Sequence, residues 1–162
     1  LVSWVAGCPR LMVLRTLSKA VGLAGLRAGY LVADPGVIDA LASIRQIYSE
    51  DVMAQAVAAA AVSRRRELVG VVADVVAERG RLAAGLAAIS GVEVWPSAAN
   101  FLLVRLPGAS RVRTRLRDEY SILVRDFSYA PGLADCLRLT VGTREENDRL
   151  LDALSILARE EA

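Results

Sequence analysis

The sequence predicts an α/β segment over residues 1–63, followed by a small α+β domain over residues 64–162. Three observations predict this organisation. Two short apolar runs bracket a glycine-rich connection near the amino end, a long amphipathic helix begins at Arg64, and short strands and helices then follow. A chain of 162 residues is long enough to bury a hydrophobic core, so we expect a folded protein.

The first segment is expected to contain the end of a helix, two strands and two helices. In chain order these are Leu1–Gly7, Leu11–Arg15, Tyr30–Ala33, Val37–Tyr48 and Asp51–Ser63. Both strand runs are apolar apart from Arg15 at the end of the first, which is typical of buried strands. The last helix is rich in alanine, which suits a helix in the core.

The second segment begins with a helix in which apolar residues recur every three or four positions. Helices are expected over Arg64–Ile89, Ser110–Tyr120 and Arg144–Glu160, and strands over Val92–Trp95, Asn100–Arg105, Ile122–Arg125 and Leu137–Val141. This pattern is typical of an α+β domain that follows the long helix.

The composition excludes several classes of function. Because there is no histidine, a Ser-His or Cys-His nucleophile pair and a histidine-ligated zinc ion are excluded. The two cysteines, Cys8 and Cys136, are isolated from each other in the sequence, so no metal site is expected. No run approaches the roughly 18 apolar residues that a membrane-spanning helix needs. The first residues also lack a secretory pattern, which predicts a cytoplasmic protein.

The charge of the chain does not predict a nucleic-acid or membrane partner. The net charge is only +2. The segment SRVRTRLRDEY carries Arg111, Arg113, Arg115 and Arg117, which fall on two faces of a helix and have no accompanying series of aromatic residues. A solvated helix surface is therefore favoured over a nucleic-acid site.

Lys19 is the only lysine beside 19 arginines. A guanidinium group stays charged at any accessible pH, whereas an ammonium group can lose its proton and become a nucleophile. Lys19 follows a predicted buried strand, directly after Ser18, and Arg27 lies eight residues further on. A glycine-rich backbone, a hydroxyl and an arginine suit a phosphate, so the set suits a phosphorylated aldehyde. The alternative is an ordinary glycine-rich connection with solvated side chains.

The segment RTLSKAVGLAGLRAGY, Arg15–Tyr30, resembles the cofactor-lysine segment of fold-type I aminotransferases, most nearly that of histidinol-phosphate aminotransferases. The resemblance continues through SAANFLLVRL (Ser97–Leu106) and ILVRDFSYAPGLADCLRLTVGTREENDRLL (Ile122–Leu151). It therefore covers essentially the whole chain. It implies that residues 1–63 belong to a large domain that binds pyridoxal 5'-phosphate and that residues 64–162 form the small domain.

The resemblance also implies a role for individual residues. Lys19 would bind the cofactor covalently and then move a proton to and from the substrate. Ser18 and Arg27 would hold the cofactor phosphate. Arg138 would receive an anionic group of the substrate, and Asn100 would lie near it. The partners implied are an amino donor, a 2-oxo acid acceptor and a second subunit in a homodimer, in amino-acid and specifically histidine biosynthesis.

Family members are about twice as long, and their amino-terminal halves supply a glycine-rich phosphate loop, a stacking aromatic and the aspartate that pairs with the pyridine nitrogen. We therefore expect a fragment, a truncated gene product or one part of a split protein, whose isolated activity is weak because the ring nitrogen lacks its carboxylate. Two alternatives stay open: a threonine-phosphate type of decarboxylase, and a non-catalytic remnant.

Overall fold

The computed structural model describes residues 1–161 and divides the chain into two compact units, one over Leu1–Gly70 and one that begins at Val71. The division falls inside the long helix α3 (Arg65–Ala87). Each unit has its own antiparallel sheet. The domain boundary that the sequence predicts, at Ser63, stays a prediction.

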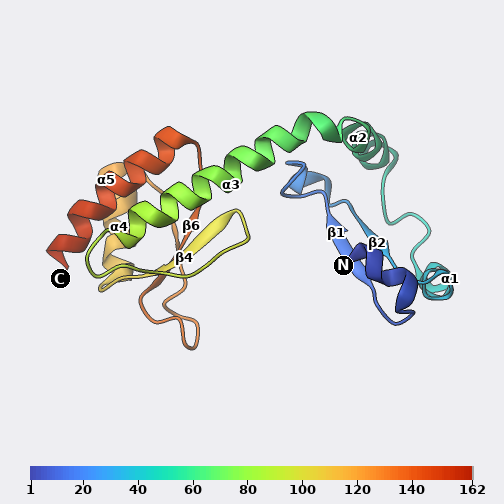
Figure 1. Cartoon of the computed structure of the whole chain (residues 1–162), viewed down its shortest axis with the longest axis horizontal. Coiled ribbons are helices and arrows are strands. Elements are labelled where there is room, and N and C mark those ends of the chain that lie inside the picture. The colour runs from blue at the N-terminus through green and yellow to red at the C-terminus, as the bar shows by residue number, and fades with distance from the viewer. Residues whose placement is uncertain (162) are drawn as a thin grey trace. The chain divides into compact units, whose positions relative to one another are not determined.

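The first unit contains a two-stranded sheet and several helices (Figure 1). Its elements are η1 (Val2–Gly7), β1 (Val13–Thr16), η2 (Ala24–Leu26), β2 (Gly29–Val32), α1 (Pro35–Ile44) and α2 (Val52–Ser63), where η marks a 3-10 helix. Strands β1 and β2 pair antiparallel, with Thr16 opposite Gly29. A Cβ atom on residue 29 would lie 2.6 Å from the carbonyl oxygen of Arg15, so this pairing requires glycine.

Both α-helices of the first unit begin at an aspartate. The Asp34 carboxylate accepts a hydrogen bond of 2.9 Å from the Gly36 amide, and Pro35 occupies the first helical position of α1. The Asp51 carboxylate accepts one of 2.8 Å from the Ala54 amide at the start of α2. These caps satisfy amides that the helix itself leaves free, which explains where the two helices begin.

The predicted burial of the first-segment strands and of the alanine-rich helix is wrong for this chain. Leu14 of β1 is 78% exposed and Val52 of α2 is 79% exposed. Among residues 1–70 the buried side chains are only Leu17, Ala28 and Ala54. Apolar composition shows that a segment is suited to burial, but the cover must come from another layer, and residues 1–70 provide one sheet of two strands.

Three predicted boundaries also differ from the structure. Leu1–Gly7 contains a 3-10 helix, η1, in place of an α-helix end, and α1 stops at Ile44 because Arg45 is extended. The predicted strand at Ile122 begins only at Arg125. The Ile122 amide instead donates a hydrogen bond of 2.8 Å to the Leu116 carbonyl, so this backbone closes the end of a helix and does not pair with a strand.

The second unit is a four-stranded antiparallel sheet packed against helices (Figure 1). Besides the carboxyl-terminal part of α3, its elements are β3 (Glu93–Val94), β4 (Phe101–Arg105), α4 (Ala109–Tyr120), β5 (Arg125–Asp126), β6 (Cys136–Thr140) and α5 (Arg144–Glu160). The strand order is β3-β4-β6-β5. Helix α5 begins with a capping box, in which Thr143 and Glu146 bond to each other's backbone amides.

One face of this sheet forms the core of the second unit. Alternate residues of β4 and β6 are buried against the apolar faces of α3, α4 and α5, and the central members are Leu82, Leu86, Leu102, Val104, Val112, Leu116, Leu137, Leu139, Leu154 and Leu157. The intervening residues of β4 and β6 point to the opposite face, where Phe101 and Arg138 are half-buried. The candidate substrate arginine therefore lies on the face that these helices leave uncovered.

Along residues 1–161, each helix is either too short or too polar to cross a membrane.

Candidate functional site

The loop Leu17–Ala28 connects β1 to β2 and carries Ser18, Lys19 and Arg27. Its base is closed by a hydrogen bond of 3.1 Å from the Leu17 amide to the Ala28 carbonyl, and both of these side chains are buried. Ser18 and Arg27 directly flank this closed pair. The structure thus brings the predicted phosphate ligands to the same end of one loop.

Thr16, the last residue of β1, positions Ser18. The Thr16 hydroxyl donates a hydrogen bond of 2.7 Å to Oγ of Ser18, and the Ser18 amide donates one of 3.1 Å back to Oγ1 of Thr16. With its oxygen already accepting a bond, the Ser18 hydroxyl can donate its own proton to an anion. Thr16 is not among the predicted site residues, although a hydroxyl side chain two positions before Ser18 is a signal that the sequence contains.

Lys19 is exposed and starts a tight turn. Its carbonyl accepts a hydrogen bond of 3.1 Å from the Gly22 amide, and Gly22 has a φ of 72°, which favours glycine. The Lys19 amine has no carboxylate within 4.0 Å among residues 1–161. It is therefore free to react with a carbonyl group.

Arg27 has a left-handed backbone with a φ of 57°, and its Nη1 donates a hydrogen bond of 3.3 Å to the Ala24 carbonyl. The remaining donors of its guanidinium group are free for an anion. The loop thus contains an amine that can bind the carbonyl carbon of a phosphorylated aldehyde. It also contains a hydroxyl donor and a guanidinium group that can bind the phosphate. The donor set of the first unit therefore fits such a cofactor.

Arg138 lies in β6 of the second unit, between two aromatic rings. Its guanidinium carbon is 5.2 Å from the ring centre of Phe101 and 5.7 Å from that of Phe127. Its Nε is buried and has no hydrogen-bond partner within residues 1–161. Two aromatic faces attract the cation without occupying its donors, which leaves the guanidinium group able to bind an anion.

Arg125 of β5 stands directly opposite Arg138 in the strand pairing. Side chains opposite each other in an antiparallel pair share one face and have Cβ atoms about 5 Å apart. Neither arginine has a carboxylate within 4.0 Å in the described part of the chain. Two guanidinium groups on one face can together bind an anion that carries more than one charge. No local sequence signal selects Arg125, because only the strand register places it beside Arg138.

Asn100 immediately precedes β4 and is half-buried. Its carbonyl accepts a hydrogen bond of 3.0 Å from the Val141 amide, so its backbone extends the pairing of β4 with β6. This position is one residue from Phe101, which contacts Arg138. A role of the Asn100 side chain in binding substrate stays a prediction.

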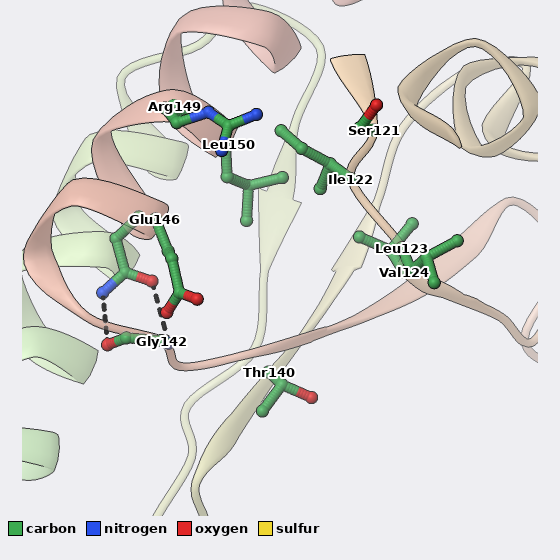
Figure 2. A pocket seen from close by; sticks show the side chains of 10 residues that line it. Ser121, Ile122, Leu123, Val124, Thr140, Gly142, Glu146, Arg149 and Leu150 are labelled. Atoms are coloured by element: carbon green, nitrogen blue, oxygen red, sulfur yellow. Dashed lines mark hydrogen bonds between the residues drawn. The ribbon is translucent and has the colours of Figure 1, made fainter. Parts of the chain in front are cut away.

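The pocket in Figure 2 lies between α5 and the segment that leads into β5, and its labelled polar residues include Ser121, Thr140 and Glu146. One wall is built by Asn147, which is 1% exposed. Its amide donates hydrogen bonds to Glu78 (2.9 Å) and to the Gly142 carbonyl (3.1 Å), and its oxygen accepts one of 3.0 Å from the Gly142 amide. Asn147 is thus a structural bridge whose polar atoms are already used.

Glu78 also belongs to this bridge. Hydrogen bonds from Arg81, and after them the bond from Asn147, lower the pKa of the Glu78 carboxyl from 4.5 to about 2. The carboxylate is therefore ionised at neutral pH and accepts bonds from both partners. The network connects α3 with α5 and with the turn after β6, and it supports the sheet from which Arg138 projects.

Three of the four arginines of α4 form ion pairs with carboxylates of the second unit. Arg111 pairs with Glu161, Arg115 with Glu119 and Glu160, and Arg117 with Asp118. These pairs neutralise much of the basic surface. They support the interpretation of α4 as a solvated helix face.

Comparison with known proteins identifies the relatives of the chain. Residues 1–154 match the family described as aminotransferase class I and II. The histidinol-phosphate aminotransferase of Roseiflexus castenholzii is 48% identical over 154 residues, which cover 93% of this chain and 41% of that protein. The chain thus spans less than half the length of this relative.

Solved structures agree with the sequence comparison. The chain is similar to the histidinol-phosphate aminotransferase of Sinorhizobium meliloti in complex with pyridoxal-5'-phosphate, with a TM-score of 0.80, 33% identity, and coverage of 95% of this chain and 42% of that one. It also resembles L-threonine-O-3-phosphate decarboxylase from Porphyromonas gingivalis (TM-score 0.78, 24% identity, 98% and 50% coverage), a likeness that concerns the fold alone. These matches confirm the fold class and the family resemblance that the sequence predicts.

Proposed function

This chain belongs to the aminotransferase class I and II family, and from this premise we propose that it acts as the carboxyl-terminal part of a pyridoxal-phosphate-dependent aminotransferase of the histidinol-phosphate type. Such an enzyme transfers an amino group from a phosphorylated amino compound to a 2-oxo acid in amino-acid biosynthesis. The observation that carries the proposal is the single loop that holds Ser18, Lys19 and Arg27 at the end of β1 and β2. The identity of 48% to the histidinol-phosphate aminotransferase of Roseiflexus castenholzii favours amino transfer.

The residues of the loop divide the work on the cofactor. The Ser18 hydroxyl, oriented by Thr16, and the Arg27 guanidinium group would hold the phosphate, and the Lys19 amine would bind the carbonyl carbon. When bound, pyridoxal phosphate would supply an electron sink for the charge that develops at the substrate α-carbon. The Lys19 amine would accept a proton from that carbon and return it, which an arginine in its place cannot do.

Arg125 and Arg138 bind the anionic groups of the substrates. Their opposite positions on β5 and β6 present two guanidinium groups to one ligand, and each can form paired hydrogen bonds to a phosphate or a carboxylate. The two classes of substrate that enter the same site, a phosphate ester and a 2-oxo acid, share this need for a cationic contact. Asn100, next to Phe101, is proposed to contribute a polar contact.

We also propose a homodimer in the cytoplasm. Family resemblance supports the dimer, and the two free thiols, Cys8 and Cys136, support a reducing compartment. Sedimentation equilibrium measures the assembly state directly. A monomer over the whole concentration range would contradict the dimer.

The test of the proposed function is covalent trapping of the cofactor. The chain is mixed with pyridoxal phosphate, reduced with borohydride, digested and analysed by mass spectrometry. Imines form on neutral amines, and Lys19 carries the only side-chain amine in the sequence. We expect a stable adduct on the peptide that contains Lys19.

Two variants distinguish imine formation by the Lys19 amine from the effect of its positive charge. Lys19→Arg keeps a positive charge and should abolish the adduct at position 19, whereas Ser18→Ala should keep the amine and lower the yield at subsaturating cofactor. Labelling confined to the amino terminus of the wild-type chain, at the level seen in Lys19→Arg, would refute the assignment of Lys19.

A further inference from the structure

Phe127 lies between the two arginines of the proposed substrate site. The ring centre of Phe127 is 5.7 Å from the guanidinium carbon of Arg125 and 5.7 Å from that of Arg138. Tyr129 stacks on the same ring at 6.1 Å with an angle of 18° between the planes. The Phe127 amide donates a hydrogen bond of 2.9 Å to the Cys136 carbonyl, so its backbone is fixed to the first residue of β6.

The two positive charges of Arg125 and Arg138 lie close together, and their repulsion must be offset by a favourable contact. Like charges directly opposite each other on neighbouring strands repel, and neither guanidinium group has a carboxylate within 4.0 Å in the described chain. The face of an aromatic ring is electron-rich and attracts a cation. Phe127 contacts both cations, whereas Phe101 contacts Arg138 alone.

The geometry at Arg138 shows which atoms the rings leave available. Nε of Arg138 is buried without a hydrogen-bond partner within residues 1–161, its terminal nitrogens make no hydrogen bond there, and the residue as a whole is half-buried. An anion can therefore reach the terminal nitrogens. The aromatic contacts fix the plane of the group without competing for those donors.

We propose that Phe127 is a positioning residue, which holds the guanidinium groups of Arg125 and Arg138 on one side of the sheet so that both bind a single anion. The proposal rests on the proposed role of the two arginines as the anion site. Phe127 has no group that can bind the anion by itself. It therefore affects the affinity of Arg125 and Arg138 for the anion only by orienting their guanidinium groups.

The experiment follows the arginine Nε–H resonances of the 15N-labelled chain by NMR during titration with inorganic phosphate at low ionic strength. Phe127→Leu keeps an apolar side chain of similar size but removes the ring, and Phe127→Tyr restores the ring. Trp95→Leu is the matched control, because Trp95 stacks on Arg105 at 4.9 Å on the same sheet but contacts neither arginine of the pair. Circular dichroism verifies that each variant is folded.

We expect Phe127→Leu to weaken phosphate binding. Each exposed contact between a ring and a cation contributes a factor of about two to five, so the loss of both should weaken binding by about 4- to 25-fold. Phe127→Tyr and Trp95→Leu should stay within about twofold of the wild-type chain. The Arg125 and Arg138 Nε–H signals should shift in Phe127→Leu even without phosphate, because the ring current is lost.

Equal phosphate affinity of Phe127→Leu and the wild-type chain would overturn the proposal, as would unchanged Nε–H signals. If the wild-type chain does not bind phosphate, the two-arginine anion site fails as part of the proposed function. The 15N relaxation of the Arg125 and Arg138 Nε–H groups without phosphate then decides the positioning role independently, because greater mobility of both groups in Phe127→Leu supports it and unchanged mobility refutes it.

Discussion

Replacement of Asn147 by alanine should strongly destabilise the second unit. Asn147 is 1% exposed and makes three hydrogen bonds, two with the backbone of Gly142 and one with Glu78. Alanine would leave the half-buried amide and carbonyl of Gly142, and the Glu78 carboxylate, without these partners, and each lost partner that stays out of water costs about 1–3 kcal/mol. Because the three bonds belong to one network and do not add fully, we expect a loss of about 3 kcal/mol in the free energy of unfolding.

Urea unfolding of the second unit can be followed by the fluorescence of Trp95 in a Trp4→Phe background, since the chain contains only these two tryptophans. With a slope of about 1.5 kcal/mol per molar, the midpoint should fall by about 2 M. Asp148→Ala is the control: it lies on the same helix with its side chain 49% exposed and should cost under about 1 kcal/mol. A midpoint for Asn147→Ala within about 0.3 M of the parent would refute the bridging role.

Two further predictions concern charge. Since the pKa of Glu78 is about 2 in the folded chain and 4.5 as its ordinary value, its contribution to stability is complete above pH 4.5 and should be lost as the pH falls from 4.5 towards 2. Glu78→Gln should flatten the pH dependence of the unfolding midpoint in this window, and an unchanged slope would argue against the pairing. Arg125→Leu should weaken phosphate binding about tenfold in calorimetry, because it removes one of two charged donors. Arg113→Leu removes an arginine outside the pair and should leave the affinity for phosphate unchanged. A similar loss of affinity in both variants would show that the net charge of the chain, and not a specific site, determines phosphate binding.

Much of the fold could be predicted from local sequence patterns. The helix predicted over Asp51–Ser63 is observed as Val52–Ser63, and the helix predicted over Arg144–Glu160 has these same bounds in the structure. The apolar residues of a helix and the residue that caps it lie within a few positions of one another in the sequence. The sequence of the helix itself therefore contains most of the information that determines where it forms. Burial in the first unit could not be predicted this way, because the exposure of Leu14 depends on which other layer covers its strand.

The candidate chemistry of the loop was suggested by the sequence. A single lysine among arginines, directly after Ser18 and before Arg27, suits a phosphorylated aldehyde, and the roles of these residues stay predictions. The role of Thr16 needed the structure, because its hydroxyl reaches Ser18 only through the local backbone geometry at the end of β1.

By itself, then, the sequence determined the elements of the chain, its family and the identity of Lys19 as the candidate catalytic residue. Only the tertiary structure decided that Arg125 faces Arg138, that Phe127 contacts both, and that Asn147 bridges two helices. The contacts of Arg138 with Arg125 and Phe127 depend on the register of β5 and β6, and Asn147 on α5 reaches Glu78 on α3, 69 positions earlier in the sequence. A shift of one residue would move a side chain to the opposite face of the sheet, so the packing of the whole unit selects the register.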